Sequence, residues 1–508
     1  MSTDSFVALR DVAFRHSAAS EPLFTALSVH LPRGFTGVVG ANGAGKTTLL
    51  ELVMGRHEPE RGSVEAPGFR VLCAQRTDRP PPELEPFLAA DDREACVLRG
   101  RLGLDALRAR AWATLSHGER KRLQIAAALW QGPDLLAIDE PTNHIDAEAR
   151  ALLMDALRRF RGVGLIVSHD REFLDGLCTR CLWMEPPTAT LFEGGLTSAR
   201  AQREALREQA LREQGIARRA RDELVRETTR RREVASRSDA RRSRRGLARK
   251  DADGRARRNL ARVSGKDGQA GRLLSQLDGR VRAVETRLDG AFVEARHELG
   301  IWITGAPSRR SQVLAVEAGC LPLGGGRVLR FPALRVRPGE RVAVTGANGA
   351  GKSTLLRHLL ATQSLQPERV LFLPQELDAE QGRSLLELVR RLPSAELGMV
   401  MNVVSRLGSR PERLLASTTP SPGELRKLML ARGITREPHL VVMDEPTNHL
   451  DLPSIECLQS ALADCPCALL LVSHDVPFLS ALTSERWCLR QAGDGDSLLE
   501  MESMAALA

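Results

Sequence analysis

Short apolar runs recur along this chain, and several stop abruptly at a glycine-rich or acidic stretch. GFTGVVG (34–40) and RVAVTG (341–346) end at glycine loops, whereas LLAID (135–139) and LVVMD (440–444) end at acidic residues. Such runs are typical of strands that are buried on both faces of a sheet. Helical patterns alternate with them, so the chain is predicted to contain α/β units with parallel sheets.

The two glycine loops are nearly identical. GANGAGKTTLL (40–50) and GANGAGKSTLL (346–356) fit G-x-x-x-x-G-K-[ST] between a strand and a helix. In this motif, backbone N–H groups surround phosphate oxygens, the lysine bridges the β- and γ-phosphates, and the hydroxyl ligates Mg²⁺. The predicted nucleotide-binding residues are Gly40, Ala41, Asn42, Gly43, Ala44, Gly45, Lys46, Thr47 and Thr48, and Gly346, Ala347, Asn348, Gly349, Ala350, Gly351, Lys352, Ser353 and Thr354.

Four further motifs recur in the same order. They are VLCAQ and LFLPQ, LSHGERKR and TPSPGELRK, DEPTNHID and DEPTNHLD, and LIVSHD and LLVSHD. The offset between copies is 306 residues for the loop lysines, 300 for the glutamines and 305 for the other motifs. Five elements at nearly one spacing indicate a duplicated domain.

The polar residues that follow these strands suit phosphoryl transfer, which needs an oriented nucleophile and balanced charge more than covalent chemistry. An aspartate at each strand end is expected to hold Mg²⁺, and the next residue, a glutamate, to polarise the attacking water. The histidine of SHD is expected to contact the γ-phosphate, and the glutamine to sense metal and water. The catalytic candidates are Glu140, Glu445, His169, His474, Gln75 and Gln375, and the metal candidates are Thr47, Asp139, Ser353 and Asp444.

This ordered set of motifs resembles the ATP-binding cassette proteins. The pair DEPTNHID and DEPTNHLD, in one chain without a membrane segment, resembles the ABC-F family. The resemblance implies a monomer whose two cassettes form an internal dimer and close head to tail over two ATP molecules. Each glycine loop then faces the signature motif of the other cassette. By this resemblance Lys46 faces Ser421 and Gly423, Lys352 faces Ser116 and Gly118, and Asp146 and Asp451 lie at the interface.

The signature motifs and the expected adenine-stacking positions depart from the family pattern. His117 and Pro422 replace a signature glycine in the first and second copies, while the serine and the following glycine are kept. The chain has no tyrosine, and His16 and Leu323 fall near the positions expected to stack on adenine. The sequence therefore leaves the choice between ATP and GTP open.

Residues 198–297 belong to neither copy and separate a first cassette (1–197) from a second (298–508). The early part of this segment lacks proline and is rich in helix formers, and Leu206 and Leu224 fall at heptad spacing. Leu277, Val281 and Val284 continue such a pattern later. We predict an antiparallel helical hairpin linker, whose first helix runs from 198 to roughly 240, with an irregular tip.

The excess positive charge lies in this linker. The net charge is +9, yet residues 201–280 hold 24 Lys and Arg against 12 Asp and Glu, which leaves 49 against 52 elsewhere. Arginine pairs bidentately with phosphate, and the charge favours a structured RNA read through its backbone. The resemblance implies a ribosome- and tRNA-interacting element. The RNA-contact candidates are Arg241, Arg242, Arg244, Arg245, Arg249, Lys250, Arg255, Arg257 and Arg258.

These features predict an ATPase that acts on the ribosome, with rRNA and tRNA as partners of the linker. Either translation regulation or ribosome protection against antibiotics fits. Two other classes remain as alternatives, the ATPase subunit of an ABC transporter and a DNA-repair or chromosome ATPase. We expect a cytoplasmic protein, because no apolar run approaches the roughly 18 residues of a membrane helix and no signal-peptide pattern opens the sequence.

Overall fold

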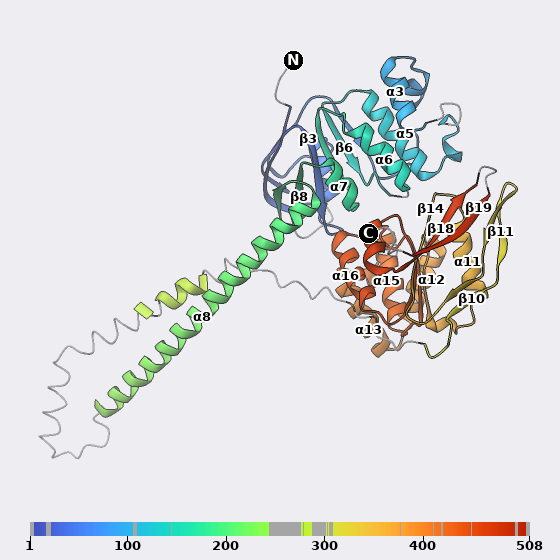
Figure 1. The fold of residues 1–508 in the computed structure, drawn as a ribbon. Coiled ribbons are helices and arrows are strands. Elements are labelled where there is room, and N and C mark those ends of the chain that lie inside the picture. Colours follow the sequence, from blue (N-terminus) through green and yellow to red (C-terminus); the bar gives the residue numbers. More distant parts are fainter. Residues whose placement is uncertain are drawn as a thin grey trace, which may run out of the picture. The chain divides into compact units, whose positions relative to one another are not determined.

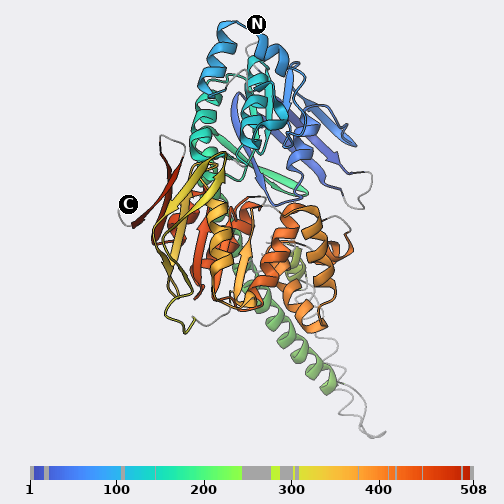
Figure 2. The same cartoon turned by 90° about the vertical axis from the view of Figure 1, so that its right-hand side faces the viewer.

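Each α/β repeat folds around a mainly parallel sheet in the computed structural model of this chain, which confirms the predicted fold class (Figures 1 and 2). The structure describes residues 5–16, 22–104, 109–143, 145–242, 276–277, 279–286, 301, 303, 308–375, 377–409, 411–417, 420–448, 450–492 and 496–503. Met1–Ala199 and His297–Ala508 form one compact unit, and Arg200–Arg296 forms a second.

The first cassette contains a six-stranded sheet in the order β5-β6-β7-β3-β8-β9, in which only β8 and β9 pair antiparallel. An antiparallel sheet, β2-β1-β4, accompanies it. The elements are β1 (Val7–Phe14), β2 (Phe24–Leu31), β3 (Gly34–Gly40), α1 (Lys46–Val53), β4 (Arg61–Glu65), β5 (Arg70–Cys73), α2 (Leu84–Ala89), α3 (Arg93–Arg101), η1 (Trp112–Thr114), α5 (His117–Trp130), β6 (Leu135–Asp139), α6 (Ala147–Leu157), β7 (Val163–Val167), α7 (Arg171–Leu177), β8 (Arg180–Glu185) and β9 (Thr188–Glu193).

The second cassette repeats this order within a larger sheet, β11-β12-β19-β18-β14-β17-β16-β15, and adds the pair β10-β13. Its elements are β10 (Leu314–Val316), β11 (Gly319–Gly324), β12 (Arg327–Phe331), β13 (Leu334–Val336), β14 (Arg341–Gly346), α11 (Lys352–Thr362), η2 (Pro367–Arg369), β15 (Val370–Leu373), α12 (Ala379–Arg390), α13 (Ser394–Arg406), α14 (Pro411–Ala416), α15 (Pro422–Ile434), β16 (Leu440–Asp444), α16 (Leu452–Ala463), β17 (Ala468–Val472), α17 (Val476–Leu482), β18 (Glu485–Gln491) and β19 (Ser497–Ser503).

The apolar runs that opened the sequence analysis form the centres of both sheets. Every residue of β6, β7, β16 and β17 is buried. Strands covered on both faces need apolar side chains at successive positions, which explains the absence of alternation. In each cassette the glycine loop, the acidic strand end and the SHD histidine follow neighbouring parallel strands, so they meet at one edge of the sheet.

A single helix, α8 (Leu196–Arg242), leads into the linker, in agreement with the expected first helix (Figure 1). Residues 279–286 are helical as well. Leu224, Thr228 and Leu277 are buried, although most described side chains of the linker are exposed. Among the described residues, no helix is both long enough and apolar enough to cross a membrane.

The basic tip lies mostly outside the described residues. Arg241 and Arg242 are the last two residues of α8, and their side chains are not described. The other RNA-contact candidates lie outside the described residues altogether; they are Arg244, Arg245, Arg249, Lys250, Arg255, Arg257 and Arg258. Their contacts with RNA therefore stay a prediction.

Candidate active site

The glycine loops have the backbone that a phosphate cradle requires. Gly40 and Gly346 adopt φ values of 152° and 148°, and a Cβ there would lie 2.6 Å and 2.5 Å from the carbonyl oxygens of Met184 and Leu489. Gly43 has φ of 80° and a Cβ built there meets nothing within 4 Å, so its face of the loop is open. Larger residues would be strained at these positions or would fill the loop.

The two loop lysines are buried against their own loops. The Nζ of Lys46 donates to the carbonyls of Gly40 at 2.8 Å and Ala41 at 3.0 Å, and Lys352 repeats this with Gly346 at 2.7 Å and Ala347 at 3.1 Å. Burial lowers the pKa of both ammonium groups, while neighbouring carboxylates act to raise it. A phosphate is the ligand that best satisfies such a cation.

Each predicted metal pair is in contact. The hydroxyl of Thr47 donates to Asp139 at 2.9 Å, and that of Ser353 donates to Asp444 at 2.7 Å. Burial raises the pKa of both aspartates. One hydroxyl and one carboxylate fit Mg²⁺, because this ion binds through few protein oxygens and takes its other ligands from water and phosphate.

The glutamates have an unusual backbone. Glu140 and Glu445 adopt φ values of 48° and 50°, in the left-handed region that non-glycine residues rarely occupy. Their amides donate to the last residue of the adjacent strand, Val167 or Val472, at 2.8 Å. Both carboxyl groups are buried, and burial raises the pKa to about 8 for Glu140 and about 7 for Glu445. A desolvated carboxylate of this kind is a stronger base than an exposed one.

The SHD histidines face these glutamates. The Nε2 of His169 lies 3.3 Å from Glu140, and that of His474 lies 3.5 Å from both Glu445 and Lys352. Burial lowers the pKa of His169 to about 3 and that of His474 to about 4. Both rings are therefore neutral at pH 7, and each can donate one hydrogen bond to a phosphate oxygen.

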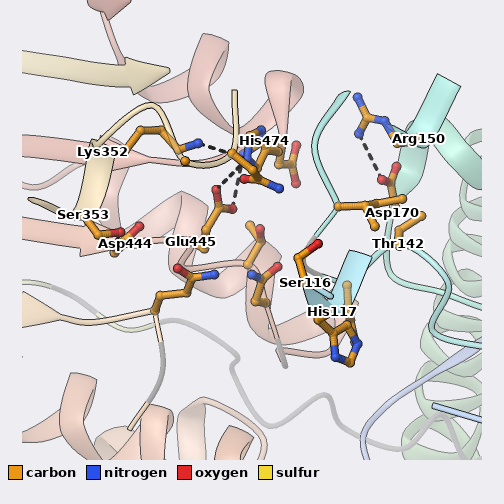
Figure 3. A pocket seen from close by; sticks show the side chains of 18 of the residues that line it. Ser116, His117, Thr142, Arg150, Asp170, Lys352, Ser353, Asp444, Glu445 and His474 are labelled. Atoms are coloured by element: carbon orange, nitrogen blue, oxygen red, sulfur yellow. Dashed lines mark hydrogen bonds and ion pairs between the residues drawn. The ribbon is translucent and has the colours of Figure 1, made fainter. Parts of the chain in front are cut away.

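A cavity of about 510 Å³ joins residues of both cassettes. Figure 3 shows Lys352, Ser353, Asp444, Glu445 and His474 on one side and Ser116, His117, Thr142, Arg150 and Asp170 on the other. Further lining residues from the sequence prediction are Asn348, Gly349, Gly351, Thr354, Gln375, Glu140 and His169. The second glycine loop and the first signature motif thus share one cavity.

The first glycine loop makes a different contact across the cassettes. The backbone N–H of Asn42 donates to the carboxylate of Asp451 at 2.7 Å, and Asp451 lies 3.7 Å from Lys427. The described contacts do not include one between Lys46 and Ser421 or Gly423, so that pairing stays a prediction. Gln75 is exposed and does not line the cavity, unlike Gln375.

Both signature serines begin a helix. Ser116 and Ser421 are the N-caps of α5 and α15, and each forms a capping box with Glu119 or Glu424. His117 and Pro422 follow directly, at the first helical position, where proline is favoured and no glycine conformation is needed. Gly118 and Gly423 are buried. The two departures from the family pattern therefore fit the local backbone.

The residues near the expected adenine position differ between the cassettes. The Nε2 of His16 lies 3.1 Å from the hydroxyl of Thr48, and its ring meets Phe14 edge to face at 5.0 Å between centroids. Leu323 lines the cavity, and its Cδ2 would lie 2.6 Å from a Cβ on Gly351. The first site thus offers a polar ring and the second an aliphatic side chain.

Three basic residues that the sequence analysis did not select belong to these sites. Lys121 and Arg426 are buried in the helices that begin at the signature serines. Arg150 lines the cavity and is paired with Asp170 at 3.0 Å and Glu172 at 2.6 Å. A signal for the first two was present, because both signatures carry a basic residue five positions after the serine. Arg150 has no such signal, since the equivalent position in the second copy is Ile455.

Comparison with known proteins gives the same picture. Residues 24–143 and 329–448 each match the family described as ABC transporter. ATP-binding protein Uup of Caulobacter vibrioides is 30% identical over 96% of this chain and 78% of its own length. Tylosin resistance ATP-binding protein TlrC of Streptomyces fradiae is 31% identical over 90% of this chain and 92% of its own length. Ribosome protection protein VmlR of Bacillus subtilis is 28% identical over 92% of this chain and 84% of its own length.

A solved structure is similar over nearly the whole chain. The archaeal ribosome recycling factor aABCE1, in a complex with the stalk protein aP1, superposes with a TM-score of 0.60 at 17% identity, covering 97% of this chain and 90% of that one. At this identity the likeness concerns the fold alone.

Proposed function

The chain belongs to the ABC-F family of tandem ATP-binding cassette proteins, and on that premise we propose that it binds the ribosome and directs its basic linker toward the tRNA and peptidyl-transferase region. Its cassettes are ATP hydrolases of the ABC type. ATP binding and hydrolysis control the linker, in translation regulation or in ribosome protection against antibiotics. The names of VmlR and TlrC, which refer to ribosome protection and tylosin resistance, support this target.

The chemistry at each site is divided among the residues described above. Lys46 and Lys352 hold the β- and γ-phosphates, and the loop amides orient the nucleotide. Thr47 with Asp139, and Ser353 with Asp444, are the residues that would hold Mg²⁺, which balances phosphate charge when bound. Glu140 and Glu445 accept the proton of the attacking water, and His169 and His474 donate to the γ-phosphate.

The observation that carries the ribosomal proposal is the concentration of positive charge in one segment, residues 201–280, between two slightly acidic cassettes. RNA is the partner that such a segment fits, because each neutralised phosphate releases a counterion. The 47 residues of α8 span roughly 70 Å at 1.5 Å per residue. A segment of this length can reach RNA far from a nucleotide site.

The first turn of α8 supports control of the linker by the cassettes. Leu196 and Ala199 are buried in the core of the first cassette, and the amide of Thr197 donates to Asp175 at 2.8 Å. A helix fixed at its first turn carries any rotation of that cassette along its length. Closure over ATP would therefore set the direction of the linker.

Cosedimentation with ribosomes tests the proposal. The protein with Glu140→Gln and Glu445→Gln should pellet with ribosomes when ATP is present and much less without it. Replacing Arg241, Arg242, Arg244 and Arg245 with Ala should weaken this binding and reduce its log–log salt slope by about 3. Four matched arginines outside the tip, Arg10, Arg61, Arg337 and Arg391, provide the control set. ATP-dependent binding that is equally salt-sensitive in both sets would contradict the role of the tip.

A further inference from the structure

Lysine is scarce in this chain, and its placement is selective. Of six lysines in the sequence, Lys46, Lys121, Lys352 and Lys427 are all buried. Lys46 and Lys352 belong to the glycine loops. Lys427 lies beside Asp451. The partners of Lys121 are backbone carbonyls of two separate strand ends, which is an uncommon setting for a cation.

Lys121 joins three parts of the first cassette. It lies in α5, is fully buried, and its Nζ donates to the carbonyl of Ala74 at 2.7 Å and to that of Asp139 at 2.8 Å. Ala74 directly precedes Gln75, and Asp139 directly precedes Glu140. One side chain therefore ties the signature helix to the backbone of the glutamine and of the glutamate.

Arg426 has the same place in the second cassette. It is 2% exposed, and its guanidinium donates to the carbonyls of Gln375, of Glu445 at 2.8 Å and of Asp444 at 3.3 Å. Lys121 and Arg426 each follow the signature serine by five residues. The two cassettes thus use different cations for one connection.

An apolar side chain would stabilise such a position at lower cost. Burying a cation loses its hydration, and carbonyl groups without charge return only part of that free energy. Burial lowers the pKa of Lys121 to about 8, although the nearby carboxylates of Asp139 and Glu140 act to raise it. The connection is therefore expensive for the fold alone, which points to a role in the reaction.

Two positions near the start of α5, its N-cap Ser116 and Lys121 in the next turn, contact residues that belong to different ATP sites. Ser116 lines the cavity with Lys352 and Glu445, whereas Lys121 holds the carbonyls of Ala74 and Asp139, and the Asp139 side chain pairs with Thr47 of the other glycine loop. We propose that Lys121 and Arg426 are positioning residues that couple the two ATP sites. Engagement of a signature serine by the nucleotide of one site shifts its helix, and the buried cation passes that shift to the glutamine and glutamate of the other site.

A double-mutant cycle tests this coupling in the full chain. In a Glu445→Gln background, remaining ATP turnover reports the site of Glu140. Ser116→Asp keeps a capping side chain at the helix N-terminus but repels a phosphate at the other site. We expect it to lower kcat at the Glu140 site about tenfold without raising KM. Lys121→Met should do the same, and the double variant should be no slower than either single one.

The controls separate coupling from folding. Lys121→Arg copies the residue of the second cassette, so in that variant Ser116→Asp should again lower kcat, as it does with Lys121 present. Thermal unfolding should show that each variant is folded. Where Lys121→Met does not fold, Lys121→Gln replaces it. The mirrored cycle uses Ser421→Asp and Arg426→Gln in a Glu140→Gln background. If the two substitutions of either cycle lower kcat independently, so that the double variant shows the product of the two single effects, the proposal is overturned. The assay contains no ribosomes, so its outcome is separate from that of the proposed ribosomal function.

Discussion

The backbone amide of Asn42 and the carboxylate of Asp451 are joined by a hydrogen bond of 2.7 Å that connects the first glycine loop to the second cassette. Asp451 also caps α16 through the amide of Ser454 and lies 3.7 Å from Lys427. Burial raises the pKa of Asp451, but Lys427, the amide of Asn42 and the hydroxyl of Ser454 together bring it below its ordinary value. A charged carboxylate therefore holds the loop from across the interface.

Asp451→Asn should destabilise the cassettes at neutral pH, because it leaves the buried ammonium of Lys427 unpaired at a cost of about 3 kcal/mol. A lowered pKa means that this stabilisation is complete above about pH 4 and is lost as the pH falls through the native pKa. The difference in unfolding midpoint between variant and wild type should thus shrink in acid. Thermal unfolding at several pH values measures it. Asp146, the counterpart in the first cassette, is half-buried, so Asp146→Asn should lower the free energy of unfolding by less than Asp451→Asn.

Glu140→Gln together with Glu445→Gln should lower kcat by at least about a hundredfold, because neither amide can accept a proton from water. The glycine loops and metal pairs are unchanged, so ATP binding should persist. Phosphate release and equilibrium binding of labelled ATP give the two measurements. Wild-type hydrolysis in the double variant would remove both glutamates from the mechanism.

Arg150→Ile should affect the two ATP sites unequally. Arg150 lines the cavity with Lys352 and is only 12% exposed as a side chain, and Ile455 occupies its place in the second cassette. Its loss leaves Asp170 without its ion pair beside that cavity. We expect turnover to fall several-fold in a Glu140→Gln background, which reports the Lys352 site, and to change little in a Glu445→Gln background.

Arg158→Ala is the matched control for this comparison. Arg158 lies at the other end of α6 and is exposed, with the carbonyl of Gly176 as its partner. It should leave turnover at both sites near wild type. An equal loss in the two backgrounds for Arg150→Ile would contradict a role confined to one site.

Leu196→Ala should cost about 3 kcal/mol, since it opens a hole in the core of the first cassette at the base of α8. Leu206→Ala, on the same helix but at a side chain that is 56% exposed, should change stability by less than about 0.5 kcal/mol. Denaturant unfolding compares the two. Similar losses for both variants would mean that the helix is not fixed through Leu196.

Motifs that carry their own chemistry could be predicted from the sequence, whereas the burial of Lys121 and Arg426 could not. The glycine loops, Asp139 and Asp444 were identifiable because their spacing is fixed by the phosphate and the metal they serve. Lys121, in contrast, stands among charged residues of a helix, a pattern that normally indicates an exposed face. Its burial depends on which strand ends lie beneath α5, and that depends on tertiary packing.

The left-handed backbone at Glu140 and Glu445 carries a consequence for evolution. Each glutamate costs about 1 kcal/mol in a conformation that glycine adopts freely, and each also buries an ionisable group. Glycine at either position would relieve this strain, so selection for turnover must retain the glutamate at both positions. A related chain that no longer needs hydrolysis at one site could therefore carry glycine in place of the glutamate of that DEPTNH motif.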